Sequence, residues 1–426
     1  MKLVIIAGGK GTRLGLTNIP KPMVEVAGKP ILEHQILLAK RYGLDEIYIL
    51  SGHLSHVIEE YFQDGSKWGV KITHIVEDKP LGTAGAIKEI EDLIEDRFMV
   101  FYGDTMMDID LANFIKNDKE ESLGTLMVHP NDHPYDSDLV DIDKENRIIK
   151  FYSKPHQENV YLPNLVNAAL YIFSPKIFEY IEAEKMQDFG KDIFPSLDNL
   201  YAYKTTEYLK DMGTPERLKK VEKDYLSGKI ARLNRSHKQK AIFLDRDGVI
   251  NKEVDNLSSI DEFELLPGVS NALKIINDSE YISIVVTNQP MIAKGFLTED
   301  ELKKIHNKME TLLGNDRVFV DDLYYCPHHP QKGFEGEVPE LKIECDCRKP
   351  KSGMLEQAAK EYNIDLENSW MIGDRYTDIQ AGKNVGCKTI LVQTGYAGND
   401  KDKYKIESDY IVKDLSEAVE IINNKE

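Results

Sequence analysis

The feature that most constrains the fold of this chain is a regular alternation of short, β-branched runs with amphipathic helical patterns. Strand-like runs and the helix-like stretches between them follow one another at 2–7, 31–43, 46–50, 54–62, 72–76, 82–94 and 98–103. Such alternation is typical of a parallel sheet whose strands are joined by crossover helices. The sequence therefore predicts a Rossmann-like α/β fold from its first residues.

The alternation stops after residue 208 and starts again near residue 241. The stretch 209–228 has helical spacing and ends on a glycine, a frequent helix stop. The next residues, "KIARLNRSHKQK", are basic and have no sustained apolar period, as expected of an exposed linker. Strand-like runs then return as "AIFLD", "YISIVVTN", "SWMIGD" and "KTILVQTG". We predict two α/β domains in tandem, residues 1–230 and 241–426, joined by a linker over 231–240.

Length and composition support this division and exclude several classes of protein. A chain of 426 residues is longer than one hydrophobic core usually organises, and 41% hydrophobic with 30% charged residues is ordinary for a globular protein. The net charge of −19 argues against a nucleic-acid partner, because phosphate backbones are bound by clustered basic residues. No segment approaches the roughly 20 apolar residues of a membrane helix. Four cysteines do not make a disulfide framework at this length. We expect a cytoplasmic protein without a membrane or nucleic-acid partner.

Polar side chains follow the predicted strands of the second domain, where ligands gather in open parallel sheets. They come from four motifs, "FLDRD", "VVTNQ", "CRKPKSG" and "MIGDRYTD", and comprise Asp245, Asp247, Thr287, Asn288, Arg348, Lys349, Asp374 and Asp378. A carboxylate can attack phosphorus only if cations offset its repulsion from the phosphate, so paired acids with a lysine and Mg²⁺ indicate a phosphatase. An isolated D-x-D is more often a capped turn. Because four such motifs occur in order, the phosphatase interpretation is favoured over a capped turn.

These ordered motifs resemble the haloacid dehalogenase superfamily over 241–424. The resemblance implies that Asp245 is a nucleophile that forms an aspartyl phosphate. Asp247 would protonate the leaving oxygen and then act as the base for the hydrolytic water. Thr287 and Lys349 would hold and neutralise the transferring phosphoryl group. Magnesium is expected at Asp245, Asp247 and Asp374.

A second metal site is predicted from "YYCPHHP" and "CDCRKP". Together they supply four ligands in a C-x-H plus C-x-C arrangement, namely Cys326, His328, Cys345 and Cys347. Four protein ligands match tetrahedral zinc and leave no open position, so this zinc is expected to be structural and to pin the loop that leads into Arg348 and Lys349. Buried, reduced cysteine would explain one thiol, as for Cys387, but not three with a histidine. His306 and His329 are expected to be structural or solvent-facing.

The loop, together with "FLDRDGVIN" and "CRKP", resembles the D-glycero-D-manno-heptose 1,7-bisphosphate 7-phosphatase family, with the histidinol phosphatases as close kin. The resemblance implies that Arg348 recognises the remote substrate phosphate, that Arg375 lies near the same substrate, and that Asn288 and Gln289 line the loop. The sequence departs from this pattern at "KEVDNL", where a His-Gly-Tyr stretch is usual, and at Pro290-Met291, where Ser-Gly is usual. Both segments are expected to face the substrate.

The first strand of the chain ends in "AGGKGTRLGLTNIPKPM". Closely spaced glycines let backbone N–H groups converge on an anion, and Arg13 and Lys21 add charge where a triphosphate would lie. A tight strand-to-helix turn is the common alternative for glycines alone, and the loop is not a Walker A motif because G-K-[ST] is absent. The residues expected at the nucleotide from this loop are Gly8, Gly9, Gly11 and Thr12.

The extended G-G-x-G-T-R-L with its downstream P-K-P resembles the sugar-1-phosphate nucleotidyltransferases, a glycosyltransferase-A-like fold, through about residue 228. The resemblance implies Mg²⁺ at Asp104 and Asp211. It implies nucleotide contacts from Leu81, Gly82 and Thr83, and sugar or sugar-phosphate contacts from Lys154 and Asn167. A solvated surface lysine is an equally good interpretation of Lys154. Ser153 and Ala169 stand where the family usually has Glu and Gly. Attack by a sugar 1-phosphate on the nucleotide α-phosphorus would release pyrophosphate, with Arg13, Lys21 and Mg²⁺ neutralising charge.

The two predicted activities fit one reaction sequence, because a heptose 1,7-bisphosphate that loses its 7-phosphate becomes a sugar 1-phosphate. We predict a bifunctional enzyme that acts on heptose bisphosphate, heptose 1-phosphate and a nucleoside triphosphate. GTP is preferred because the first domain most resembles heptose and mannose 1-phosphate guanylyltransferases. Two alternatives stay open. One is a mannose or hexose 1-phosphate transferase fused to a phosphatase of other specificity, such as histidinol phosphate, and the other makes one domain a non-catalytic regulatory module.

Overall fold

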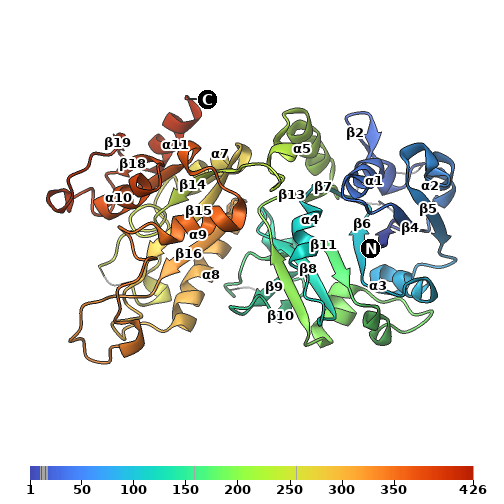
Figure 1. Cartoon of the computed structure of the whole chain (residues 1–426), viewed down its shortest axis with the longest axis horizontal. Helices are drawn as coiled ribbons and strands as arrows, with labels where there is room; N and C mark the ends of the chain where they lie inside the picture. The colour runs from blue at the N-terminus through green and yellow to red at the C-terminus, as the bar shows by residue number, and fades with distance from the viewer. Residues whose placement is uncertain (10, 12–14, 16–17, 158, 256, 426) are drawn as a thin grey trace. The chain divides into compact units, whose positions relative to one another are not determined.

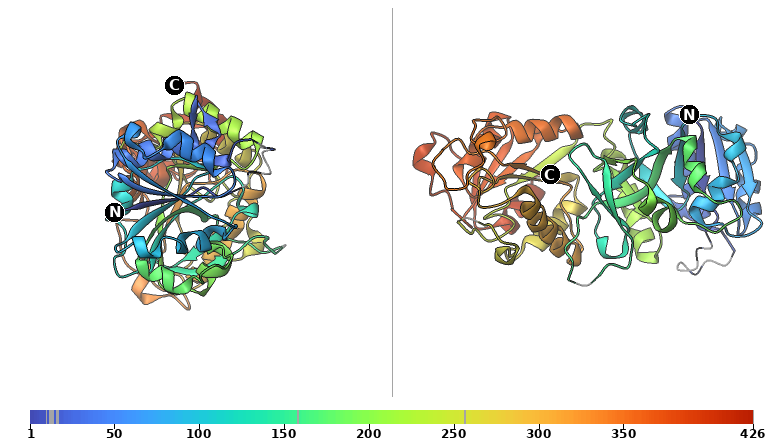
Figure 2. Two further views of the ribbon diagram at one scale, coloured as in Figure 1. Left: turned by 90° about the vertical axis from the view of Figure 1, so that its right-hand side faces the viewer. Right: turned by 90° about the horizontal axis from the view of Figure 1, so that it is seen from below.

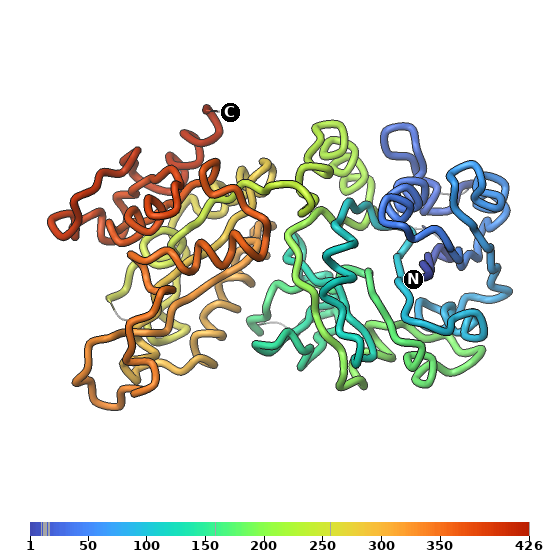
Figure 3. The backbone as a smooth tube through the Cα atoms, viewed as in Figure 1, coloured from blue at the N-terminus to red at the C-terminus, as the bar shows by residue number. Residues whose placement is uncertain are grey.

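The computed structural model describes residues 1–9, 11, 15, 18–157, 159–255 and 257–425. The chain divides into two compact units. Unit 1 comprises Met1–His129, Ser137–Lys154 and Leu165–Ser236, and unit 2 comprises Pro130–Asp136, Pro155–Asn164 and His237–Glu426. Figure 3 follows the backbone through both units, from the amino terminus in blue to the carboxyl terminus in red. The last residue of unit 1, Ser236, falls inside the linker predicted over 231–240, whose bounds stay a prediction.

Unit 1 is built on a mixed sheet of nine strands (Figure 1). Its strands are β1 (Leu3–Ile6), β4 (Glu46–Ser51), β5 (Lys71–Val76), β6 (Phe98–Tyr102), β8 (Gly124–His129), β9 (Leu139–Ile142), β10 (Ile148–Tyr152), β11 (Val166–Phe173) and β12 (Leu200–Lys204). β6, β1, β4 and β5 are parallel neighbours, as the alternating sequence pattern predicts. The other half is mixed, because β11 runs antiparallel to β6 and β8 while β9 and β10 form a hairpin.

Helices cover both faces of this sheet, which Figure 2 (left) shows from the side of unit 1. Alternate strand residues such as Ile5, Ile49 and Phe101 form one core layer with α1, α2 and α4, while Val4 and Val100 belong to the layer on the other face. The helices of unit 1 are α1 (Ile31–Arg41), α2 (Ser55–Phe62), α3 (Gly82–Lys88), α4 (Leu111–Lys116), α5 (Pro215–Leu226) and α6 (Lys229–Arg232). The predicted helix over 82–94 is shorter than expected, since a separate 3-10 turn follows α3. Two small two-stranded ribbons pair β2 (Glu25–Val26) with β3 (Lys29–Pro30), and β7 (Thr105–Asp108) with β13 (Tyr208–Asp211).

Unit 2 is a six-stranded sheet with order β16-β15-β14-β17-β18-β19, and all its pairings are parallel. The strands are β14 (Lys240–Leu244), β15 (Tyr281–Asn288), β16 (Asp322–Cys326), β17 (Trp370–Gly373), β18 (Lys388–Val392) and β19 (Tyr410–Val412). The chain passes from β14 outward to β15 and β16, then returns to β17 on the other side of β14. This reversal makes the carboxyl ends of β14, β15 and β17 the natural place for a ligand.

Five helices enclose the sheet of unit 2: α7 (Val269–Asp278), α8 (Glu299–Asn315), α9 (Gly353–Tyr362), α10 (Tyr376–Asn384) and α11 (Leu415–Asn423). Alternate strand residues, among them Ile242, Val285 and Ile372, share one core cluster with α7, α8 and α11. α9 and α10 contact the strands but contribute nothing to that cluster, so they lie on the opposite face. The prediction of two α/β domains with Rossmann-like sheets is confirmed. Among the described residues, no helix has both the length and the apolar character needed to cross a membrane.

Candidate active sites

The carboxyl ends of β14, β15 and β17 bring three predicted residues of unit 2 together. Asp245 follows the last residue of β14, Asp374 follows β17, and Thr287 lies near the end of β15. All three side chains are buried. Consecutive residues of these strands are buried, which fixes the strands in the core and presents polar residues at or just beyond the carboxyl end of each strand at one edge.

A cluster of carboxylates lies at this edge. Oxygens of Asp245, Asp374 and Asp378 all lie within 4.8 Å of one another. Asp378 comes from the first turn of α10, one helical turn beyond Asp374, and it was named from its motif without a role. The Lys349 ammonium lies 3.0 Å from Asp245 Oδ1 and 2.7 Å from Asp378 Oδ1, and it donates to the Val286 carbonyl at 2.7 Å. Lys349 is thus a buried cation between two buried acids.

The charges of this cluster are only partly balanced. Burial and the nearby acids raise the pKa of Asp374 to about 9, and burial outweighs Lys349 in raising the pKa of Asp245 to about 7. Burial lowers the pKa of Lys349, but Asp245 and Asp378 more than offset it and hold that pKa above its ordinary value. Asp374 Oδ1 is buried without a hydrogen-bond partner among the described residues. Three acids, one lysine and an unpartnered oxygen fit a divalent cation bound by oxygen ligands.

The Asp247 carboxylate is not among these clustered oxygens, and its role as a magnesium ligand stays a prediction. Its oxygens accept hydrogen bonds from Arg246 at 2.8 and 2.9 Å, from Asn251 at 2.9 Å and from Gln289 at 2.9 Å. Burial raises the pKa of Asp247, but Arg246 and the two amides outweigh burial and hold that pKa below its usual range. These donors hold the Asp247 carboxylate in place beside the cavity, while Asp378 supplies the third of the clustered oxygens.

A cavity of about 290 Å³ opens beside the carboxylates. Every residue that the sequence analysis placed at the phosphatase substrate lines it, namely Asp245, Asp247, Thr287, Asn288, Gln289, Arg348, Lys349 and Arg375. The two segments that depart from the heptose pattern also line it, with Glu253, Val254, Asp255 and Leu257 from one and Pro290 and Met291 from the other. Five lining residues had no predicted catalytic or substrate role: Lys294, His329, Thr377, Asp378 and Tyr396. Lys294 could have been noticed from the sequence, because it is a basic residue only three positions after Met291, in a segment expected to face the substrate.

Several of these lining residues are fixed by contacts with one another. Asn288 and Lys349 exchange hydrogen bonds between the Asn288 side chain and the Lys349 backbone, each 3.0 Å long. Arg348 donates to the His328 carbonyl at 3.1 Å. The Arg375 guanidinium carbon lies 3.2 Å from the centre of the Tyr396 ring. Asn288 therefore fixes the backbone at Lys349. Arg348 and Arg375 place donors at the cavity wall.

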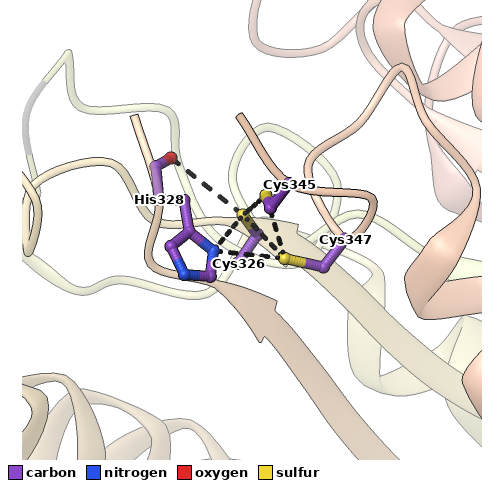
Figure 4. A group of neighbouring side chains, drawn as sticks. All are labelled: Cys326, His328, Cys345 and Cys347. Atoms are coloured by element: carbon purple, nitrogen blue, oxygen red, sulfur yellow. Dashed lines mark hydrogen bonds between the residues drawn. The ribbon is translucent and has the colours of Figure 1, made fainter. Parts of the chain in front are cut away.

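The four predicted metal ligands Cys326, His328, Cys345 and Cys347 converge in space (Figure 4). The sulfur of Cys347 lies 3.2 Å from both other sulfurs and 3.3 Å from His328 Nδ1, and Cys326 Sγ lies 3.5 Å from Cys345 Sγ and 3.7 Å from His328 Nδ1. Ligands at about 2.0–2.3 Å from a tetrahedral metal are separated by roughly 3.3–3.8 Å. This group fits a four-coordinate metal, whereas Cys387 is buried alone.

In unit 1 the glycine-rich turn follows β1. Gly8, Gly9 and Gly11 are described, whereas Thr12 and Arg13 lie outside the described residues. Gly11 has a φ of 61°, a conformation that favours glycine. A Cβ at Gly8 would lie 3.4 Å from the Glu77 carboxylate, which was not singled out from the sequence. The turn thus passes close to an acid at the end of β5.

Of the predicted metal ligands of unit 1, Asp211 is the last residue of β13 and Asp104 directly precedes β7, the strand that pairs with β13. Asp211 pairs with Thr105 across β13 and β7, and the Met212 amide donates to the Asp104 carbonyl at 3.2 Å. The Asp104 carboxylate is ion-paired with the buried Lys21. Arg217 donates to Asp211 Oδ1 at 2.7 Å. Two acids far apart in sequence, each with a basic partner, therefore lie side by side.

The segments predicted to meet base and sugar also have defined partners. Gly82 has a φ of 74°, and a Cβ there would lie 2.5 Å from the Gln187 carbonyl oxygen, so only glycine fits without a shift. Thr83 donates to Asp188 Oδ1 at 3.2 Å, and Leu81 is buried. Lys154 is exposed, and its amide donates to Asp138 Oδ1 at 3.1 Å, while the Asn167 amide donates to the Asp138 carbonyl at 3.0 Å. Asp138 thus links the two predicted sugar-site positions.

Comparison with known proteins matches the two halves separately. The family model described as nucleotidyl transferase matches residues 2–228, and the HAD-hydrolase-like model matches residues 346–418. A D-glycero-beta-D-manno-heptose-1,7-bisphosphate 7-phosphatase of Haemophilus ducreyi is 40% identical over 187 residues, which are 43% of this chain and 99% of that protein. The D-glycero-alpha-D-manno-heptose-1,7-bisphosphate 7-phosphatase of Photorhabdus laumondii is 41% identical over 173 residues, 40% of this chain and 92% of that protein.

Two solved structures each align with part of the chain. HddC from Yersinia pseudotuberculosis is 30% identical, covers 53% of this chain and 99% of its own, and has a TM-score of 0.47. A D,D-heptose 1,7-bisphosphate phosphatase from B. bronchiseptica is 33% identical, covers 44% of this chain and 100% of its own, and has a TM-score of 0.39. From its family-model match, the chain belongs to the nucleotidyl transferase family, and its second half belongs with the HAD-type heptose-bisphosphate phosphatase relatives. It is a transferase and phosphatase enzyme.

Proposed function

We propose that the chain carries out two consecutive steps towards a nucleotide-activated heptose. The second half would hydrolyse the 7-phosphate of D-glycero-D-manno-heptose 1,7-bisphosphate, and the first half would transfer a nucleotidyl group, GMP from GTP, to the resulting heptose 1-phosphate. The observation that carries the phosphatase is the buried Lys349, which bridges Asp245 and Asp378 at the cavity floor. Relatives that are 39–40% identical over 97–99% of their length supply the heptose assignment.

In the proposed phosphatase reaction, Asp245 attacks the phosphorus. Asp247 gives a proton to the leaving oxygen and then accepts one from the hydrolytic water. Lys349 and Thr287 hold the phosphoryl oxygens from the floor of the cavity. Asp245, Asp374 and Asp378 would hold Mg²⁺, which supplies positive charge that offsets the repulsion between the carboxylate and the phosphate. Together these residues direct the attack and neutralise the charge of the phosphoryl group.

The composition of the cavity wall suits a sugar with a second phosphate. Arg348, Arg375 and Lys294 provide cations at the cavity lining, and arginine is the preferred partner of phosphate. Glu253 and Asp255 provide acceptors for sugar hydroxyls on the same wall. At about 290 Å³, the cavity is near the lower end of the range for small-molecule pockets. A phosphate-rich, polyhydroxylated substrate matches this mixture of charges.

In the transferase half, Lys21, Asp104 and Asp211 are the described groups placed to act on the nucleotide and the sugar phosphate. Asp104 and Asp211 would hold a second Mg²⁺, and Lys21 would neutralise phosphate charge. No enzyme nucleophile is needed, so positioning supplies most of the catalysis. The preference for GTP follows from the sequence resemblance to sugar 1-phosphate guanylyltransferases.

We further infer that the Cys326, His328, Cys345 and Cys347 group holds zinc in a structural role. Cys347 directly precedes Arg348 and Lys349, so a closed four-ligand site would fix the start of the catalytic loop. Thiol ligands require a reducing compartment, which fits the proposed cytoplasmic location.

A one-pot assay tests the proposal. The chain is incubated with Mg²⁺, D-glycero-D-manno-heptose 1,7-bisphosphate and one of GTP, ATP, CTP or UTP, and phosphate, pyrophosphate and nucleotide sugar are resolved. We expect phosphate in every reaction and pyrophosphate with nucleotide-heptose in the GTP reaction alone. Absence of phosphate refutes the heptose assignment, and histidinol phosphate is then the comparison substrate. Pyrophosphate with a different nucleotide refutes the GTP assignment only.

Two variants separate the half-reactions. Asp245→Asn is expected to abolish phosphate release but to leave transfer to added heptose 1-phosphate intact, while Asp104→Asn gives the reverse pattern. Asp346→Asn is the control, because the Asp346 side chain is 95% exposed and pairs only with the exposed Lys351 among the described contacts. A wild-type chain with only one of the two activities, which is lost when the other unit is substituted, would support the regulatory-module alternative.

A further inference from the structure

Arg246, between the two aspartates of "DRD", is a completely buried arginine with 0% exposure. Its Nη2 donates to both carboxylate oxygens of Asp247, at 2.9 and 2.8 Å. On the other side, its Nη1 lies 3.1 Å from Nε2 of His306. A buried guanidinium needs partners for its donors, and these two contacts fix it at both ends.

His306 lies on α8, sixty residues further along the chain. It is 8% exposed, and its ring lies 5.8 Å from that of Tyr325. Arginine has donors only, so Nε2 of His306 must accept the hydrogen bond and the ring is neutral. Burial, followed by the charge of Arg246, lowers the pKa of His306 well below its usual value, in agreement with a neutral ring. The sequence analysis expected His306 to be structural or solvent-facing and did not identify its contact with Arg246.

The Asp247 carboxylate lines the substrate cavity and is 18% exposed. Asn251 and Gln289 each donate to one of its oxygens, but Arg246 is its cationic partner and contacts both. The direction of the carboxylate thus depends on where the guanidinium lies. The guanidinium in turn depends on His306.

We propose that His306 is a positioning residue for the phosphatase, which anchors Arg246 and through it aims the Asp247 carboxylate into the cavity. The inference rests on the proposed phosphatase function and on the acid–base role of Asp247. His306 does not line the cavity, so its effect passes through Arg246. Arg246 holds the Asp247 carboxylate ionised in the free chain, so the proton that Asp247 passes to the leaving oxygen would first move to it from the bound phosphate monoester.

The test compares His306→Phe, which keeps a ring but has no acceptor, with His306→Gln, which restores an acceptor. The full-length chain is assayed with Mg²⁺ on the heptose bisphosphate, whose alcohol leaving group needs a proton, and on 2,4-dinitrophenyl phosphate, whose phenolate does not. The quantity compared is kcat/KM, which reports the steps up to release of the leaving group. General acid catalysis contributes about 10²–10⁴-fold to the rate, and an Asp247 carboxyl that points in the wrong direction loses part of that contribution.

We expect His306→Phe to lower kcat/KM about 10–100-fold for the heptose bisphosphate and less than about 3-fold for the dinitrophenyl ester. His306→Gln should recover the first value to within about 5-fold of wild type. Equal losses on both substrates without rescue by glutamine, or no loss at all, overturn the inference. If the phenylalanine variant does not fold, His306→Leu takes its place. A wild-type chain that hydrolyses neither substrate refutes the proposed phosphatase, and the inference with it.

Discussion

Glu253 allows a test of whether burial in the substrate cavity disfavours an ionised carboxylate. Its side chain is 17% exposed, lines the cavity, and lies 3.7 Å from Arg375. Burial and the charge of Asp247 raise the pKa of Glu253 from 4.5 to about 7, and Arg375 only partly opposes them. The folded chain therefore binds a proton on Glu253 between pH 4.5 and 7 that the unfolded chain has released.

The sign of the effect follows from this linkage. Because the folded state holds the extra proton, stability falls as pH rises through this window, and the full cost is present above the folded pKa. A shift from 4.5 to about 7 corresponds to about 3 kcal/mol. Glu253→Gln cannot ionise, so it should stabilise unit 2 by up to about 3 kcal/mol at pH 8.5 and by less than about 1 kcal/mol at pH 5.

The assay is urea unfolding of the full-length chain at both pH values. The chain has two tryptophans, Trp68 in unit 1 and Trp370 in unit 2, so a Trp68→Phe background leaves Trp370 fluorescence as the reporter of unit 2. Glu264→Gln is the matched control, since Glu264 is 65% exposed and pairs with Lys252, and it should change stability by less than about 0.5 kcal/mol at either pH. A loss of stability at pH 8.5 in Glu253→Gln would refute the reasoning, because it would mean that Arg375 stabilises the ionised carboxylate more than burial penalises it.

Three further predictions concern the charges and metals of unit 2. Lys349→Met leaves buried acids without their cation and should destabilise unit 2 by about 3–5 kcal/mol and abolish phosphate release, whereas Lys351→Met, at an exposed ion pair, should do neither; urea unfolding and phosphate assays check this. Burial raises the pKa of Asp374 to about 9, so Mg²⁺ binding at pH 8 should release protons and tighten as pH rises; indicator-dye titration measures both, and Asp374→Asn should reduce the proton release. Cys345→Ser should lose one equivalent of zinc by elemental analysis and lower phosphatase activity more than Cys387→Ser, whose thiol stands alone; equal zinc content in both variants would contradict the assigned ligands.

Three of the phosphatase motifs could be located from sequence because each lies at the end of a buried strand, whereas "CRKPKSG" comes some twenty residues after β16. Once β14, β15 and β17 are recognised as parallel neighbours, their carboxyl ends must meet, so Asp245, Thr287 and Asp374 had to come together. The four cysteine and histidine ligands were likewise identified by their spacing. Local sequence was sufficient in both cases because the chemistry lies within a few residues of a strand end.

Contacts that depend on helix packing could not be predicted in this way. His306 reaches Arg246 only because α8 packs on the face of the sheet that carries Ile242 and Val285, and nothing in "KKIHNK" specifies that contact. The antiparallel pairings in the mixed half of the unit 1 sheet were missed for a related reason. A buried apolar run shows that a strand exists, but its direction depends on pairing with partners far along the chain, as for β11 between β6 and β8.

The two acids on either side of Arg246 show how the fold separates roles that the sequence leaves alike. Asp247 receives a fixed guanidinium and two amides, so it is held ionised and oriented. Asp245 lies among other acids with Lys349 as its cation, and burial still raises its pKa to about 7. The proposed nucleophilic role of Asp245 needs an ionised carboxylate, which burial opposes more strongly than Lys349 favours. Asp374 Oδ1 has no hydrogen-bond partner among the described residues, so the cation proposed at this cluster would add the positive charge that favours ionised Asp245.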